Sequence, residues 1–130
     1  MASVIGRNVA RKLVRSVIFT PADRPSAMMK AVNSLDADVV VLDLEDAVSP
    51  DLKLTARSNV VNFLKSGPFN RCSVVVRVNC PKTTPWGIDD INALYNLGLD
   101  AIILPKVEEE SMINLTTSIT KERSHTGKAS

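Results

Sequence analysis

The chain has 130 residues, of which 45% are hydrophobic and 23% are charged. This is the composition of an ordinary globular domain, and it excludes a wholly disordered chain, a collagen and a coiled coil. Sixteen basic against 14 acidic residues leave a formal net charge of only +2, which provides no general attraction to nucleic acid. No apolar run approaches the ~20 residues needed to span a bilayer, so no membrane association is expected.

Basic residues are concentrated at the N-terminus. Four of them precede the first acidic residue of the chain: Arg7, Arg11, Lys12 and Arg15. An arginine-rich start without acidic residues is typical of a mitochondrial transit peptide, and a short solvated helix is the plain structural alternative. We therefore predict that residues 1–14 are a basic extension or a transit peptide, and that the protein is mitochondrial or cytoplasmic.

The rest of the chain alternates between strand and helix patterns, beginning with a β-branched run at 16–20 that predicts a short strand. Pro21 and Pro25 delimit the loop that follows. Pro25 suits the first turn of a helix, and apolar residues at helical spacing extend that helix over 26–35.

The second unit begins at 38–44, where four consecutive apolar residues indicate a strand buried on both faces, as in a parallel sheet. A helix is predicted over 50–66, with Ser49 or Asp51 as its N-cap. Its core-facing residues are predicted to be Leu54, Val61 and Leu64, with Ala56 and Val60 beside them.

The third unit pairs a predicted strand at 73–78 with a helix at 89–97 that ends at Gly98. The fourth pairs a strand at 101–104 with a helix at 108–121, whose acidic first turn is favoured by the helix dipole.

Four successive βα units predict an α/β domain at 15–122 with a parallel sheet, followed by a frayed tail at 123–130. Two architectures are compatible with this pattern. One is an open sheet with helices on both faces. The other is the first four βα units of a (β/α)8 TIM barrel, which is therefore incomplete, since ~250 residues are typical of that fold.

Both architectures bind ligands at the C-terminal ends of the parallel strands. Polar residues follow every predicted strand, in the order Asp23 and Arg24, then Asp43, Glu45 and Asp46, then Arg77 and Asn79, and finally Lys106 and Glu108. This distribution predicts a site at one rim of the sheet.

The acidic residues at this rim place three carboxylates, those of Asp43, Glu45 and Asp46, within four positions. Such a cluster suits a divalent cation, held directly or through water, or a catalytic base; the alternative is a polar turn with a capping Asp. Arg77 could bind a substrate carboxylate in bidentate fashion. It could equally form a salt bridge to Asp43 or Glu45, because an unpaired buried charge is costly.

Four strings, read together, resemble one known family: RSVIFTPADRP at 15–25, ADVVVLDLEDAV at 37–48, VVVRVN at 74–79 and DAIILPKVE at 100–108. In this order they are similar to the citrate lyase beta-subunit-like proteins of the aldolase/citrate lyase family, which includes malyl-CoA and citramalyl-CoA lyases. The resemblance implies a TIM-barrel enzyme that depends on Mg and is a homo-oligomer. The implied reaction is a Claisen-type cleavage or condensation of a short-chain 3-hydroxy diacyl-CoA thioester to an acyl-CoA and an oxo acid.

The resemblance also implies roles for single residues. Arg77 matches the arginine that binds the substrate carboxylate beside the metal. Glu45 and Asp46 match an acidic pair near the water shell of the metal. The family's direct magnesium ligands and its catalytic aspartate follow the LPKVE segment, so we expect none of them within these 130 residues.

Contacts to coenzyme A are implied in the same way for the first βα unit. Phe19 and Lys30 match positions around the CoA moiety, and Arg24 is a neighbour of that region. Some relatives carry a lysine early in the first helix, where this chain has Ser26, which weakens that contact.

Two other interpretations remain open at this point. One is a truncated isoform or pseudoenzyme that binds a partner or a CoA-like ligand without turnover. The other is a flavodoxin-like domain, which only the number of βα units supports. A four-stranded half barrel would leave two open sheet edges, which predicts self-association or poor stability.

Overall fold

A computed structural model describes residues 3–6, 15–33 and 36–105 of the chain. The elements in chain order are β1 (Ser3–Gly6), β2 (Val17–Pro21), α1 (Pro25–Asn33), β3 (Val39–Asp43), a 3₁₀ turn (Pro50–Leu52), α2 (Lys53–Lys65), β4 (Ser73–Arg77), α3 (Gly87–Leu94) and β5 (Ala101–Leu104). The predicted helix at 108–121, the tail at 123–130 and most of the basic extension lie outside the described residues. None of the described helices is long and apolar enough to cross a membrane.

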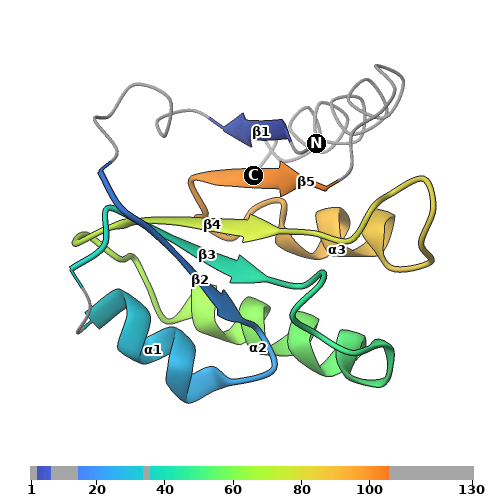
Figure 1. The fold of residues 1–130 in the computed structure, drawn as a ribbon, viewed down its shortest axis with the longest axis horizontal. Helices are drawn as coiled ribbons and strands as arrows, with labels where there is room; N and C mark the ends of the chain where they lie inside the picture. The colour runs from blue at the N-terminus through green and yellow to red at the C-terminus, as the bar shows by residue number, and fades with distance from the viewer. Residues whose placement is uncertain (1–2, 7–14, 34–35, 106–130) are drawn as a thin grey trace.

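The five strands form one sheet in the order β1-β5-β4-β3-β2. Strands β2 to β5 are parallel, and β3, β4 and β5 each lie beside the strand that precedes them in the sequence (Figure 1). A doubly wound sheet reverses its strand order at a switch point, whereas a (β/α)8 barrel adds its strands consecutively. The predicted barrel-type arrangement is therefore confirmed for four parallel strands and the three helices that connect them, and the flavodoxin-like alternative is wrong.

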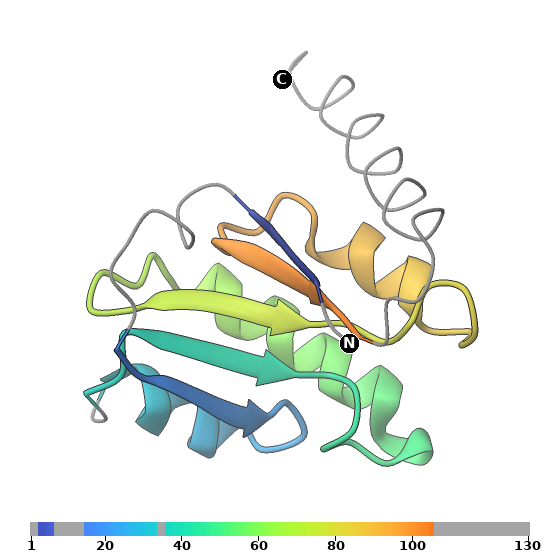
Figure 2. The same cartoon turned by 45° about the horizontal axis from the view of Figure 1, so that its top comes forward.

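The helices cover one face of the sheet (Figures 1 and 2). Alternate strand residues point to opposite faces, and those that face the helices join the larger core: Val40, Leu42, Val74, Val76, Ile102 and Leu104. The other set forms a smaller cluster on the helix-free face, made of Val39, Val41, Val75 and Ala101. Burial on both faces explains why these strands are continuous apolar runs.

Two details of the predicted helices are wrong. Ser49 makes no side-chain capping bond; its Oγ donates to Oδ1 of Asp51 at 2.8 Å, and the helix begins through a 3₁₀ turn. α3 begins and ends before the predicted bounds, and Gly98, with φ of 72°, lies beyond its C-terminus.

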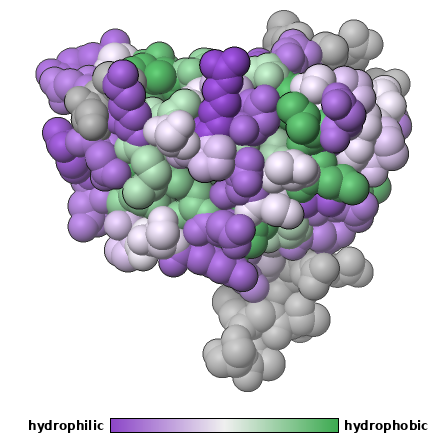
Figure 3. Space-filling model, turned by 90° about the horizontal axis from the view of Figure 1, so that it is seen from below, coloured by the Kyte–Doolittle hydropathy of each residue, from purple (hydrophilic) through white to green (hydrophobic). Residues whose placement is uncertain are grey.

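The prediction for the core face of α2 also needs one correction. Leu54 is 63% exposed, whereas Lys53 is only 7% exposed. The buried stripe of α2 begins at Lys53 and continues through Ala56, Val60 and Phe63. On the outer, helix-covered side the surface is mostly hydrophilic and its hydrophobic areas are separate (Figure 3).

Strand β1 pairs with the outer edge of β5 in antiparallel fashion, with Ser3 opposite Leu104 and Gly6 opposite Ala101. In a complete barrel the next parallel strand would pair with this edge. Residues 3–6 are therefore a strand rather than a helix, and the edge of β5, which the four-stranded half barrel would leave open, is covered. In the described sheet the outermost strands are β1 and β2, so the edge lies at β1 instead of β5 on one side and at β2 on the other.

Deletion of residues 1–6 is expected to promote association of the chain. It would leave the N–H and C=O groups along the β5 edge unpaired, and such an edge is a template for another strand. Sedimentation velocity should show a concentration-dependent increase in the sedimentation coefficient. A chain shortened by six residues at its C-terminus is the length control. Identical concentration dependence in both shortened chains would contradict the protective role of β1.

Candidate functional site

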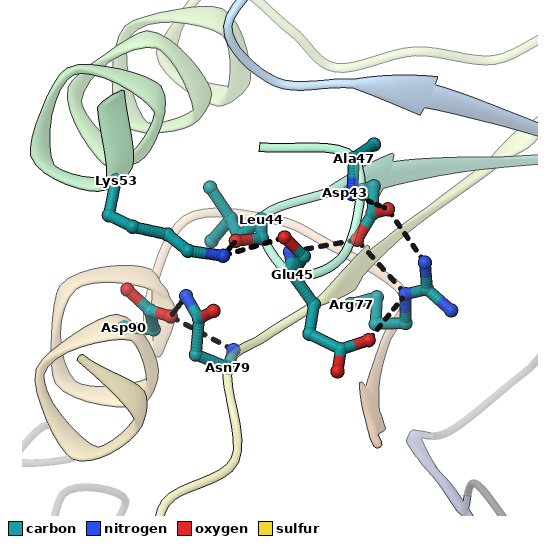
Figure 4. Close-up of polar contacts among 8 residues, drawn as sticks. All are labelled: Asp43, Leu44, Glu45, Ala47, Lys53, Arg77, Asn79 and Asp90. Carbon is teal, nitrogen blue, oxygen red and sulfur yellow. Dashed lines mark hydrogen bonds and ion pairs between the residues drawn. The ribbon is translucent and has the colours of Figure 1, made fainter. Parts of the chain in front are cut away.

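The site lies where β3 and β4 end, on the helix-free face. Asp43 and Arg77 are the last residues of these strands and stand opposite each other in the register. Arg77 donates from Nε to Oδ1 of Asp43 at 2.9 Å and from Nη2 to Oδ2 at 2.7 Å (Figure 4). The side chain of Asp43 is 2% exposed and that of Arg77 is 23% exposed. The salt-bridge alternative for Arg77 is thus present in the structure, as a bidentate pair.

Asp43 also shapes the turn that follows β3. Its Oδ1 accepts a hydrogen bond from the backbone N–H of Glu45 at 2.9 Å, and its Oδ2 accepts one from that of Ala47 at 3.1 Å. Burial alone would raise the pKa of Asp43, but the hydrogen bonds from Arg77 and Glu45 and the charge of Arg77 hold it below its ordinary value. Asp43 therefore remains an ionised, fully engaged acceptor.

The structure separates the two residues predicted near the metal. Oε1 of Glu45 lies 3.5 Å from Nε of Arg77, and Glu45 is buried. Asp46 is exposed at the surface of the turn. In the described part of the chain, no three Asp, Glu, His or Cys side chains converge to hold a metal ion. The role of Glu45 and Asp46 near the water shell of a metal stays a prediction.

Of the three residues predicted near CoA, the structure brings one to this cluster. Phe19 is 51% exposed, and its ring centroid lies 5.0 Å from Cζ of Arg77, which is a cation–π contact. Arg24 is exposed, and its carbonyl accepts hydrogen bonds from the first turn of α1. Lys30 is exposed in the last turn of α1, which runs back from the rim (Figure 1). Among the salt bridges of the described residues, none joins Arg24 or Lys30 to Asp43 or Glu45, the carboxylates that pair with Arg77.

Lys53 lies behind the same turn, and the sequence analysis gave it no role. Its Nζ donates to the carbonyl oxygens of Leu44 at 2.9 Å and Glu45 at 2.6 Å, and it lies 5.4 Å from the ring centroid of Trp86. Burial lowers the pKa of Lys53, and the charges of Asp43 and Glu45 oppose this only in part. Lys53 occurs at helical spacing with the apolar residues Ala56, Val60 and Phe63, and this spacing could have indicated from the sequence that it is buried.

A second buried carboxylate, that of Asp90, connects α3 to the end of β4 and to α2. Asp90 accepts hydrogen bonds from the backbone N–H of Asn79 at 3.1 Å and from its Nδ2 at 2.8 Å, and pairs with Nε of Arg57 at 2.8 Å. Gly87 permits this approach, because a Cβ there would lie 2.5 Å from the backbone of Pro81.

The stability of the fold should decrease in acid. The folded-state pKa of Asp43 is below its ordinary value, so the ionised carboxylate stabilises the folded state. This contribution to the free energy of unfolding is complete above the unfolded pKa of about 4, and it is lost as the pH falls through the folded-state pKa. Denaturant unfolding at a series of pH values measures this loss, which Asp43→Asn should reduce. Asp36→Asn, at an exposed position, is the control. An equal acid loss in the two variants would rule Asp43 out as its source.

Comparison with known proteins identifies relatives of this chain. The family model of the HpcH/HpaI aldolase/citrate lyase matches residues 15–129. Citrate lyase subunit beta of Leuconostoc mesenteroides subsp. cremoris is 38% identical over 108 residues, which are 83% of this chain and 35% of the relative. L-malyl-CoA/beta-methylmalyl-CoA lyase of Cereibacter sphaeroides is 39% identical over 95 residues, which are 72% of this chain and 30% of the relative.

A solved structure also aligns with most of this chain. It is CitE from Mycobacterium tuberculosis in complex with magnesium, acetoacetate and coenzyme A, with a TM-score of 0.62 and 33% sequence identity. The alignment covers 79% of this chain and 36% of that one. The present chain therefore spans only a minor part of the length of each of these relatives.

Proposed function

The chain belongs to the HpcH/HpaI aldolase/citrate lyase family, and from this premise we propose that it carries the substrate-carboxylate side of a carbon–carbon lyase site. The reaction proposed is the Claisen-type cleavage or condensation of a short-chain 3-hydroxy diacyl-CoA thioester to an acyl-CoA and an oxo acid. Two relatives support this class of chemistry: one is a malyl-CoA lyase, and the other was solved with acetoacetate and coenzyme A.

The observation that carries the proposal is the way Arg77 is held. A guanidinium has five N–H donors, and Asp43 takes one from Nε and one from Nη2. The edge formed by Nη1 and the second N–H of Nη2 is left for another planar acceptor, and an oxo-acid carboxylate matches it in bidentate geometry. Asp43 and the ring of Phe19 hold the guanidinium plane in place before a ligand arrives.

The charge of this cluster supports a requirement for a cation. The carboxylates of Asp43 and Glu45 stand beside the guanidinium of Arg77 and the ammonium of Lys53, so a substrate carboxylate would bring an additional negative charge to the cluster. A divalent ion would offset that charge. We propose magnesium for this role, with direct ligands other than the described residues. A homo-oligomeric state and a mitochondrial or cytoplasmic location stay predictions.

Nuclear magnetic resonance titration with acetoacetate, with and without magnesium chloride, tests the proposal. The Nε–H signal of Arg77 and the ring signals of Phe19 should shift on addition of acetoacetate. Arg77→Lys keeps the charge but loses the planar edge, so it should abolish the response; Arg71→Lys, at an exposed position, should not. Absence of any shift at Arg77 at millimolar acetoacetate with magnesium would overturn the proposal. Binding without turnover would favour the non-catalytic alternative.

A further inference from the structure

The turn after β3 is held from two sides (Figure 4). On one side, the carboxylate of Asp43 accepts the backbone N–H groups of Glu45 and Ala47. On the other side, the ammonium of Lys53 donates to the carbonyl oxygens of Leu44 and Glu45. The backbone of Glu45 is thus fixed at both its N–H and its C=O group. This fixes the position from which the Glu45 side chain extends.

The ammonium of Lys53 is unusual for its position. Lys53 as a whole residue is only 7% exposed, and the other members of its stripe, Ala56, Val60 and Phe63, are apolar. In the described part of the chain, no carboxylate forms a salt bridge with it, so backbone carbonyls and the Trp86 ring are its partners. Burying a charge is costly, and an apolar side chain would fill this position without that cost. What the ammonium adds over an apolar side chain is its pair of hydrogen bonds to the turn after β3.

We propose that Lys53 is a positioning residue for the candidate site, acting through the backbone of Glu45. It holds the turn so that Oε1 of Glu45 remains beside Nε of Arg77, 3.5 Å away. The effect on ligand binding rests on the proposed function. The effect on the turn does not, because it depends only on the two hydrogen bonds from Nζ.

Hydrogen exchange of the Lys53→Met variant tests the effect on the turn. Methionine keeps the apolar stem and removes the ammonium, so the carbonyls of Leu44 and Glu45 lose their partner. The amides of Glu45 and Ala47 should then exchange about tenfold faster or more, whereas those of Val41 and Val75 in the sheet should be unchanged. Lys65→Met, at the exposed end of the same helix, is the matched control. Unchanged exchange at Glu45 and Ala47 would overturn the proposal.

The titration with acetoacetate and magnesium separates this proposal from the proposed function. Lys53→Met should weaken binding by about tenfold, and Glu45→Gln should add little to that loss, because the two residues act as one unit. Additive losses would overturn the route through Glu45. If the unmodified chain binds no acetoacetate, the proposed function fails while exchange at Glu45 still decides the positioning role.

A measurement on the unmodified chain covers the case in which Lys53→Met does not fold. The ¹⁵Nζ resonance of Lys53 should appear as a slowly exchanging ammonium with couplings across hydrogen bonds to the carbonyl carbons of Leu44 and Glu45. An Nζ signal that exchanges as fast as that of Lys65 would overturn the proposal.

Discussion

Replacing Arg77 by methionine is expected to destabilise the folded chain by about 3–5 kcal/mol, the usual cost of removing one partner of a buried ion pair. Asp43, with 2% of its side chain exposed, would lose two hydrogen bonds and its countercharge. It would keep only the N–H groups of Glu45 and Ala47. Urea unfolding at neutral pH measures the change, with Arg71→Met as a surface control. A loss below about 1 kcal/mol is typical of an exposed pair and would contradict this account.

The source of this loss can be isolated with a double-mutant cycle and a pH series. Asp43→Asn in the Arg77→Met background should cost much less than in the unmodified chain, because the uncompensated charge is already the main penalty. Lowering the pH should also reduce the difference between Arg77→Met and the unmodified chain. Without Arg77, burial raises the carboxyl pKa, so Asp43 can take up a proton instead of remaining charged. A difference that grows in acid would contradict the assignment.

Asp90→Asn is the second substitution with a large expected effect, a destabilisation of about 3 kcal/mol. The side chain of Asp90 is 1% exposed and pairs with Arg57, and it accepts two hydrogen bonds from Asn79. An amide would remove the charge opposite Arg57. It could not accept all of these donors as well.

The neighbouring residue provides a matched control for this substitution. Asp89 is in the same first turn of α3 but is exposed, so Asp89→Asn should lose only the favourable interaction with the helix dipole, about 0.3–1 kcal/mol. Urea unfolding of both variants gives the comparison, and the backbone amide signal of Asn79 should shift in Asp90→Asn alone. Equal destabilisation by the two variants would show that the buried contacts of Asp90 with Arg57 and Asn79 do not contribute to stability.

The sequence by itself was sufficient for the architecture. Continuous apolar runs located strands β2 to β5, because these strands are buried on two faces, and helical periodicity located α1 to α3. The strings at 15–25, 37–48, 74–79 and 100–108 indicated the family, which the match to residues 15–129 confirms. The rule that parallel strands bind ligands at their C-terminal ends placed Asp43, Glu45 and Arg77 together.

Tertiary structure alone decided which polar groups pair. Periodicity tells which face of an element is buried, but a buried charge is satisfied by a residue on another element, and no local pattern names it. Asp43 and Arg77 are 34 positions apart in the chain, and Asp90 and Arg57 are 33 apart. The same reason applies to β1, whose place at the β5 edge depends on which edge is open, and to Lys53, whose partners are backbone carbonyls of the turn after β3.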